Sequence, residues 1–317
     1  MRDQLSFADG FVHPGLGANA KLDGIEAAID WSFLEALVAP LRAAHTGRPP
    51  YDAVIMTKAL LLGALYDLSD PALEAQLADR LSFRRFCGLG LDAPTPDETT
   101  ICRFRALAAE FDLMQRVLDE VTAQFEARGL ILKKGTLMDA TLIKAAHNPP
   151  PKAAGLGAAH PREPGATWTK KAGKAHFGYK LHIGVDEGSG LVRRAVVSGA
   201  KTYESEVADA LISWDEGAVY GDKAYPNKAR RAALKAHAIK DRIAHRRHKT
   251  VASLPPWRQL WNRAVARRRA PVEAVFSAGK RLYGLARATC HSLKRNTQRF
   301  IAFAIVYNLR RATLIKA

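Results

Sequence analysis

The first 130 residues carry the hydrophobic pattern of helices. Between residues 24 and 128 apolar side chains recur with helical spacing. The run from Asp52 to Asp67 is apolar nearly all round, which predicts a central helix buried on every side. We therefore expect residues 1–130 to form an all-helical N-terminal domain.

Start and stop signals divide this half further. Pro71 is predicted to begin a helix that runs to about Phe86. In Thr95-Pro96-Asp97-Glu98 we expect Thr95 to be the N-cap of the next helix, with Pro96 in its first position and Glu98 completing a capping box. That helix is predicted to run to Arg128 and to stop at Gly129.

After residue 130 the pattern changes to that of strands. Residues 136–145 form an apolar run with one acid, Asp139, and predict a buried strand. Residues 147–175, rich in Pro, Gly, Ala and Lys, predict a long loop. From His176 to Ser198 apolar and polar positions alternate around a Gly-rich turn, which predicts an antiparallel hairpin with His176 and His182 on its solvent face.

The remaining elements alternate between helix and strand. The predicted order is a helix at 205–213, a strand at 218–222, a helix to about His237, a weak strand at 238–244, a helix that Pro271 opens, and a last helix at 298–313. A strand, a hairpin and alternating helices indicate an α/β fold with a mixed sheet and helices on both faces. We expect a ribonuclease-H-like domain over residues 131–317.

Three acids occupy notable positions in these elements. A lone carboxylate in a buried strand, as expected for Asp139, is costly unless a positive group meets it. A divalent metal is one such group, and a turn-capping Asp at a strand end is the alternative. Asp222 at the end of a later strand and Glu273 on a following helix favour the metal. Carboxylates from separate elements suit two Mg²⁺ ions about 3.5–4 Å apart, which stabilise both oxygens in phosphodiester cleavage.

The charge distribution indicates the kind of partner. The net charge is +17, and residues 223–317 contain 24 Lys and Arg against two acids, Asp241 and Glu273, whereas residues 1–222 contain 24 against 29. Such asymmetry is typical of proteins that bind a polyanion, most simply nucleic acid. The alternative is a solvated basic surface, but surfaces made for solubility usually mix the two signs.

Other features restrict the compartment. Cys87, Cys102 and Cys290 show no paired spacing, which suits a reducing cytoplasm and argues against a zinc cluster or a disulfide framework. The chain lacks an apolar run of 18 residues, so we expect no membrane span, and its first residues lack the pattern of a signal peptide.

Several motifs stand out along the chain. Residues 131–317 contain Thr-Leu-Met-Asp-Ala-Thr-Leu-Ile (136–143), His-Phe-Gly-Tyr-Lys-Leu-His-Ile-Gly-Val-Asp (176–186), Gly221-Asp222-Lys223-Ala224-Tyr225, and Arg269-Ala270-Pro271-Val272-Glu273 with Lys280. Residues 1–130 contain Arg48-Pro49-Pro50-Tyr51, Tyr66-Asp67-Leu68-Ser69-Asp70 and Pro96-Asp97-Glu98-Thr99-Thr100-Ile101. Together these motifs resemble the DDE transposases of bacterial insertion sequences, and in particular the IS-five type.

The resemblance implies that Asp139, Asp222 and Glu273 are the catalytic, metal-binding triad, with Mg²⁺ or substituting Mn²⁺. It implies that Arg269 and Lys280 belong to the Arg-x₃-Glu-x₆-Lys signature that grips the transposon end, and Arg267 and Arg268 are expected to contact DNA beside them. The implied activity is binding of terminal inverted repeats, cleavage of the ends and joining of the 3′-hydroxyl to target DNA. We expect a homodimer on two ends, in a bacterial cytoplasm at the nucleoid.

Two departures from the family pattern leave another interpretation open. The family has a Tyr three residues before the Arg, where this chain has Ala266, and a Gly where this chain has Ala224. If position 224 requires positive φ, Ala strains the turn beside the metal site. The alternative function is a decayed or domesticated DNA-binding protein that acts as a repressor.

Overall fold

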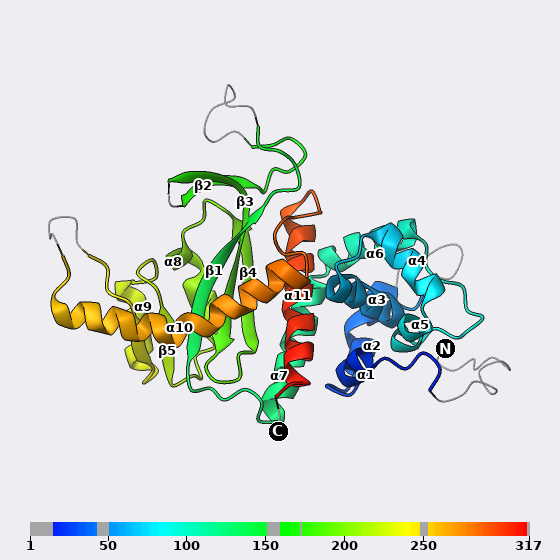
Figure 1. The fold of residues 1–317 in the computed structure, drawn as a ribbon, viewed down its shortest axis with the longest axis horizontal. Helices are drawn as coiled ribbons and strands as arrows, with labels where there is room; N and C mark the ends of the chain where they lie inside the picture. Colours follow the sequence, from blue (N-terminus) through cyan, green and yellow to red (C-terminus); the bar gives the residue numbers. More distant parts are fainter. Residues whose placement is uncertain (1–14, 43–50, 151–158, 172, 248–252, 316–317) are drawn as a thin grey trace.

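The computed structural model describes residues 15–42, 51–150, 159–171, 173–247 and 253–315 (Figure 1). Residues 151–158 of the expected loop and Arg48–Pro50 of the N-terminal motif lie outside these ranges. A helical region stands on one side of the molecule and a sheet with its own helices on the other (Figure 1).

The N-terminal half is helical, as the sequence predicts. Its elements are α1 (Ala20–Glu26), α2 (Phe33–Val38), the 3-10 turn η2 (Ala39–Arg42), α3 (Ala53–Tyr66), α4 (Asp70–Asp79), α5 (Leu81–Cys87), α6 (Glu98–Glu110) and α7 (Leu113–Ala127). The predicted central helix is confirmed as α3, in which the side chain of Asp52 caps the start and Asp67 ends the helix in the left-handed region.

Three boundary predictions in this half are wrong. The helix expected from Pro71 to Phe86 is two helices, because Arg80 is extended (φ −94°, ψ 112°) between α4 and α5. The helix expected to run to Arg128 breaks at Asp112, whose φ of 48° is left-handed, a conformation that Asp tolerates. The N-cap of α6 is Asp97 and not Thr95, since the Asp97 carboxylate accepts a hydrogen bond from Thr100 N at 2.7 Å.

The C-terminal half is built on a mixed sheet. Its strands are β1 (Thr136–Lys144), β2 (Thr167–Lys171), β3 (Lys174–Asp186), β4 (Val192–Gly199), β5 (Ala218–Gly221) and β6 (Lys240–Ile243). β1 is central, antiparallel to β3 on one side and parallel to β5 on the other, and β6 continues the parallel side. This order is the ribonuclease-H-like arrangement that the sequence predicts.

The hairpin of β3 and β4 is confirmed, but two expectations around it are wrong. The long loop contains a strand, β2, which pairs with β3 beyond the end of β4, so Thr167 meets Gly178 one residue past the last β4 pair. His182 is not on a solvent face and is fully buried. The face that carries His182 is covered by α8 (Glu204–Val207) and η4 (Ala208–Leu211), so β3 is buried on both sides.

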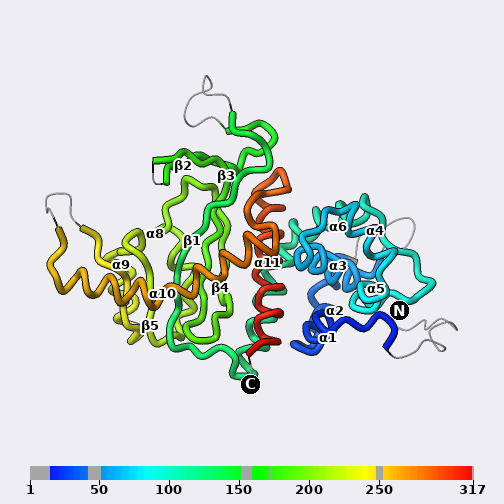
Figure 2. Tube along the Cα trace, in the orientation of Figure 1, coloured from blue at the N-terminus to red at the C-terminus, as the bar shows by residue number. Residues whose placement is uncertain are grey.

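Helices cover both faces of the sheet (Figures 1 and 2). α8, η4 and α9 (Lys228–Ala236) lie on one face over a small apolar core that includes Met138 and Val219. α10 (Pro256–Leu282) and α11 (Leu293–Ala312) lie on the other. The prediction that Pro271 opens a helix is wrong, because α10 begins at Pro256 and continues through Pro271.

α11 joins the two halves of the molecule. It packs against α3, α6 and α7 of the helical region and against β4 of the sheet, and it stands between them in Figure 1. Buried residues of α3, α7, β3, α10 and α11 belong to one continuous hydrophobic core. No helix in the described ranges is long and apolar enough to cross a membrane.

Candidate catalytic site

A fork between two parallel strands creates the candidate site. β1 and β5 pair only at Thr136 with Val219 and at Leu137 with Tyr220. Beyond these pairs the strands separate, so Asp139 of β1 and Asp222, the residue after β5, lie on either side of the opening. The Met138 carbonyl has no β5 partner there and instead accepts a hydrogen bond from Arg269 Nε at 3.2 Å.

Asp139 meets a positive group, as its position in a buried strand requires. Arg269 Nη2 lies 3.0 Å from Asp139 Oδ2, and Oδ1 accepts a hydrogen bond from Ala140 N at 2.8 Å. Burial raises the pKa of Asp139, the Arg269 charge and the Ala140 bond lower it, and the charges of Asp222 and Glu204 raise it. The net direction is upward, and burial is its largest cause.

Asp222 begins a tight turn at the other side of the fork. Its Oδ1 accepts a hydrogen bond from Ala224 N at 2.8 Å, and its carbonyl accepts one from Tyr225 N at 3.1 Å. Ala224 is not among the described residues with positive φ, so the Ala found in place of Gly does not strain this turn.

Glu273 is carried by the same helix as Arg269. It lies on α10, four residues and therefore about one helical turn after Arg269, and its side chain is exposed. Its charge is not among the causes that shift the pKa of Asp139. In the described residues no three His, Cys, Asp or Glu side chains are arranged to hold a metal ion.

Two residues that the sequence analysis did not single out face the fork. Tyr225 is fully buried beneath Gly221 and Met138, and its hydroxyl lacks a hydrogen-bond partner within the described residues. Glu204 opens α8, and its charge raises the pKa of both Asp139 and Tyr225. Tyr225 stands in the Asp-Lys-Ala-Tyr motif, which was a usable signal, whereas Glu204 has no local pattern of that kind.

The basic residues expected to bind DNA have different surroundings. Arg269 is 13% exposed and held by Asp139, whereas Arg267 and Arg268 are exposed on the solvent side of α10. Arg268 Nη1 lies 3.4 Å from Glu187 Oε1. Lys280 is on the same continuous helix as Glu273, two turns further on, which confirms that one helix carries both.

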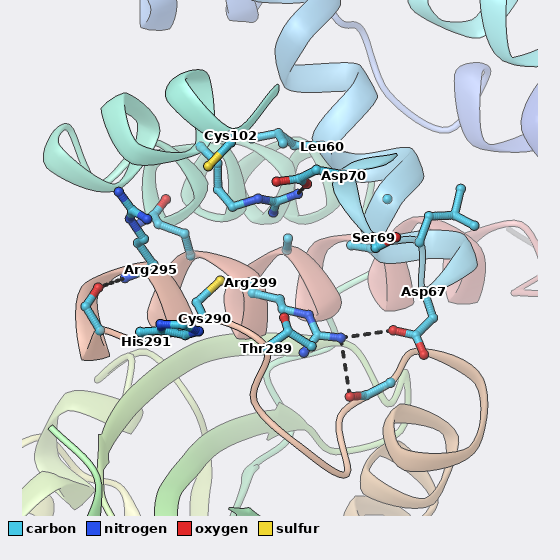
Figure 3. A pocket seen from close by; sticks show the side chains of 18 of the residues that line it. Leu60, Asp67, Ser69, Asp70, Cys102, Thr289, Cys290, His291, Arg295 and Arg299 are labelled. Carbon is cyan, nitrogen blue, oxygen red and sulfur yellow. Dashed lines mark hydrogen bonds and ion pairs between the residues drawn. The ribbon is translucent and has the colours of Figure 1, made fainter. Parts of the chain in front are cut away.

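Lys280 also lines a cavity of about 920 Å³ between the helical region and the α10–α11 end of the molecule. Figure 3 shows this cavity, with Arg299 reaching Asp67 across it at 2.9 Å. Arg105 pairs with Asp70, and Arg287 donates to the carbonyls of Ala145 and Ala146. Within the described residues, the side chains of three further lining cations make no hydrogen bond or ion pair: Arg162, Lys280 and Arg295.

The fold and site together define a ribonuclease-H-like protein with Asp139 and Asp222 on either side of the fork of its central parallel strands. Comparison with protein families agrees. Residues 132–309, more than half of the chain, match the transposase DDE domain, and residues 14–107 match a transposase domain (DUF772). The chain belongs to the DDE transposase family. No solved structure matches it.

Proposed function

We propose that this DDE transposase serves a small insertion sequence of the IS-five type. It binds the terminal inverted repeats, cleaves the DNA ends by metal-assisted hydrolysis and joins the 3′-hydroxyl to target DNA. The observation that carries the proposal is the partly buried Asp139, which flanks the β1–β5 fork together with Asp222 and meets the Arg269 guanidinium.

Asp139, Asp222 and Glu273 are the proposed ligands of two Mg²⁺ ions, for which Mn²⁺ can substitute. Their carboxylate oxygens are the donors that Mg²⁺ prefers. Bound metal would polarise the scissile phosphate and supply a nucleophilic water at neutral pH.

Arg269 changes partner in this proposal. In the structure its guanidinium neutralises Asp139, so a cation bound by that carboxylate would leave Arg269 able to contact a DNA phosphate. Glu273 lies one turn further along α10, so a modest shift of that helix relative to β1 would bring its exposed carboxylate toward the fork.

The DNA contacts are proposed along α10 and beyond it. Arg267 and Arg268 present exposed guanidinium groups, and Lys280 opens onto the cavity beside the helical region. Residues 1–130 would act as a domain that reads the transposon end, and residues 131–317 as the catalytic domain. Two ends must be joined, which favours a homodimer on DNA, working at the nucleoid in the bacterial cytoplasm.

Cleavage of a labelled native terminus tests the proposal. The full-length chain with Mg²⁺ should cut at the end of the inverted repeat, and Asp139→Asn should not. If the Asp139→Asn protein still binds the terminus, its loss of cleavage is a defect in catalysis and not in DNA binding. Specific binding without cleavage by the wild type, under Mg²⁺ and Mn²⁺ alike, would instead support a domesticated repressor.

A further inference from the structure

The charge of Glu204 acts on Asp139 of the candidate site, although Glu204 stands outside the motifs quoted in the sequence analysis. It is the first residue of α8, on the opposite face of the sheet from α10. Lys180 Nζ lies 3.5 Å from Glu204 Oε1, and the Glu204 side chain is 24% exposed. Lys180 in turn pairs in the sheet with Leu142 of β1, three residues beyond Asp139.

A buried arginine fixes α8 against the turn that follows Asp222. Arg230 of α9 donates to the Ser205 carbonyl at 2.6 Å and also to the Tyr225 carbonyl. Its side chain is only 1% exposed. The Arg230 guanidinium therefore bridges two carbonyls, one of Ser205, the residue after Glu204, and one of Tyr225, the last residue of the turn that Asp222 begins. Glu204 cannot move far from the fork while these bonds remain.

The Tyr225 hydroxyl is a buried polar group near these acids. Tyr225 is fully buried, and its hydroxyl makes no hydrogen bond within the described residues. Buried polar groups in folded proteins are nearly always satisfied by protein, water or ligand. Burial and the charges of Asp139, Glu204 and Asp222 raise the pKa of this hydroxyl, and the Tyr225 side chain lies beside Gly221 at the end of β5.

We propose that Glu204 is a further carboxylate of the divalent-cation site, together with Asp139 and Asp222. This inference rests on the proposed function and adds a residue to its metal site. In the structure Lys180 pairs with Glu204 and Arg269 pairs with Asp139. Glu204, Asp139 and Asp222 would hold a divalent cation through their carboxylate oxygens in place of these pairings.

Mn²⁺ binding tests this without relying on activity. The metal-free full-length protein is titrated with Mn²⁺, and free Mn²⁺ is followed by its electron paramagnetic resonance signal. Glu204→Gln should weaken binding by about 10–100-fold, the range for residues that tune a metal site. Glu206→Gln is the matched control, since it makes the same change on the same short helix at an exposed position and should bind as the wild type does.

Two further variants make the result decisive. Glu204→Asp keeps the charge and should restore part of the affinity, even if Glu204→Gln is poorly folded. Asp139→Asn should lose binding whatever Glu204 does. If Asp139→Asn loses Mn²⁺ while Glu204→Gln and Glu204→Asp both bind normally, the role of Glu204 is overturned and the proposed function stands. If the wild type binds no Mn²⁺ at all, both are overturned.

Discussion

The two faces of the sheet are built in different ways. The face under α10 and α11 belongs to an apolar core that continues through α11 into α3 and α7 of the helical region. The face under α8 and α9 has a much smaller core and holds buried polar groups, among them His182, Tyr225 and Arg230. Asp139 and Asp222 lie at the strand fork between the two.

This difference separates stability from chemistry. Apolar burial contributes roughly 25 cal/mol per Å², so the larger core supplies most of the stabilisation. The polar groups of the smaller face contribute little net stability, but they determine where Glu204, Asp222 and Tyr225 stand. We therefore expect changes at the fork to affect activity more than stability, and changes in the large core to do the reverse.

The largest expected effect is on cleavage. Glu273→Gln should reduce end cleavage by at least about a hundredfold, because a ligand carboxylate becomes an amide. The thermal midpoint should stay unchanged, since the Glu273 side chain is exposed and surface changes rarely matter for stability. Binding of the terminus should persist or tighten as a negative charge near phosphate disappears. Normal cleavage by this variant would mean that another residue completes the site.

In the large core the expected effect is on stability. Phe300 is a buried α11 residue whose ring lies 6.4 Å from that of Tyr179 on β3. Phe300→Ala should lower the free energy of unfolding by about 3–5 kcal/mol, measured by urea denaturation, because it leaves a cavity. Cleavage by the fraction that remains folded should be normal. Leu314→Ala, at a position 65% exposed, is the control and should change stability by less than about 0.5 kcal/mol.

The sequence was sufficient where one local pattern determines the structure. α3 is apolar all round, the β3–β4 hairpin alternates around a Gly-rich turn, and β1 is an apolar run, so each was predictable. α10 was harder, because Pro271 suggested a helix start. A proline already in a helix loses one hydrogen bond, and α10 accommodates this at an exposed position. Pro256 was the true start signal.

The site was predictable only in part. Asp139 and Asp222 were identifiable because each stands in or after an apolar strand. The ion pair of Asp139 with Arg269 depends on how α10 crosses β1, which no local pattern records. The position of Glu204 near Asp222 depends on the hydrogen bonds of Arg230. Arg230 is 26 positions away in sequence, and no local sequence pattern indicates its role. Whether Glu273 joins the aspartates remains a prediction.

The side of the sheet under α8 and α9 should make the stability of the protein depend on pH in the acid range. Burial, followed by the Lys180 charge, lowers the pKa of His182 to about 4, from 6.5 in the unfolded chain. The unfolded state therefore binds more protons between these values, and stability falls as pH drops from 6.5 to about 4. The pKa difference corresponds to about 3 kcal/mol.

His182→Gln should remove this component of the acid sensitivity. Urea unfolding from pH 7 to pH 4 measures it, with His176→Gln on the same strand, only partly buried, as the control. An unchanged pH slope in His182→Gln would mean that His182 can be protonated without unfolding the smaller face.

The smallest expected effect concerns DNA grip at the far end of α10. Lys280 makes no ion pair within the described residues, and partial burial with nearby Lys171 lowers its pKa, as expected for a cation that lacks an anionic partner. If Lys280 contacts one phosphate, Lys280→Ala should reduce the slope of log K against log salt by about 0.9 for the terminal duplex. Cleavage at saturating DNA should survive in part, because the carboxylates are untouched.

Lys240→Ala, at an exposed lysine on β6, is the control, and its slope should equal that of the wild type. Equal slopes for all three proteins would place the DNA away from the C-terminal end of α10, and a flat salt response of the wild type would contradict phosphate binding by the basic C-terminal third altogether.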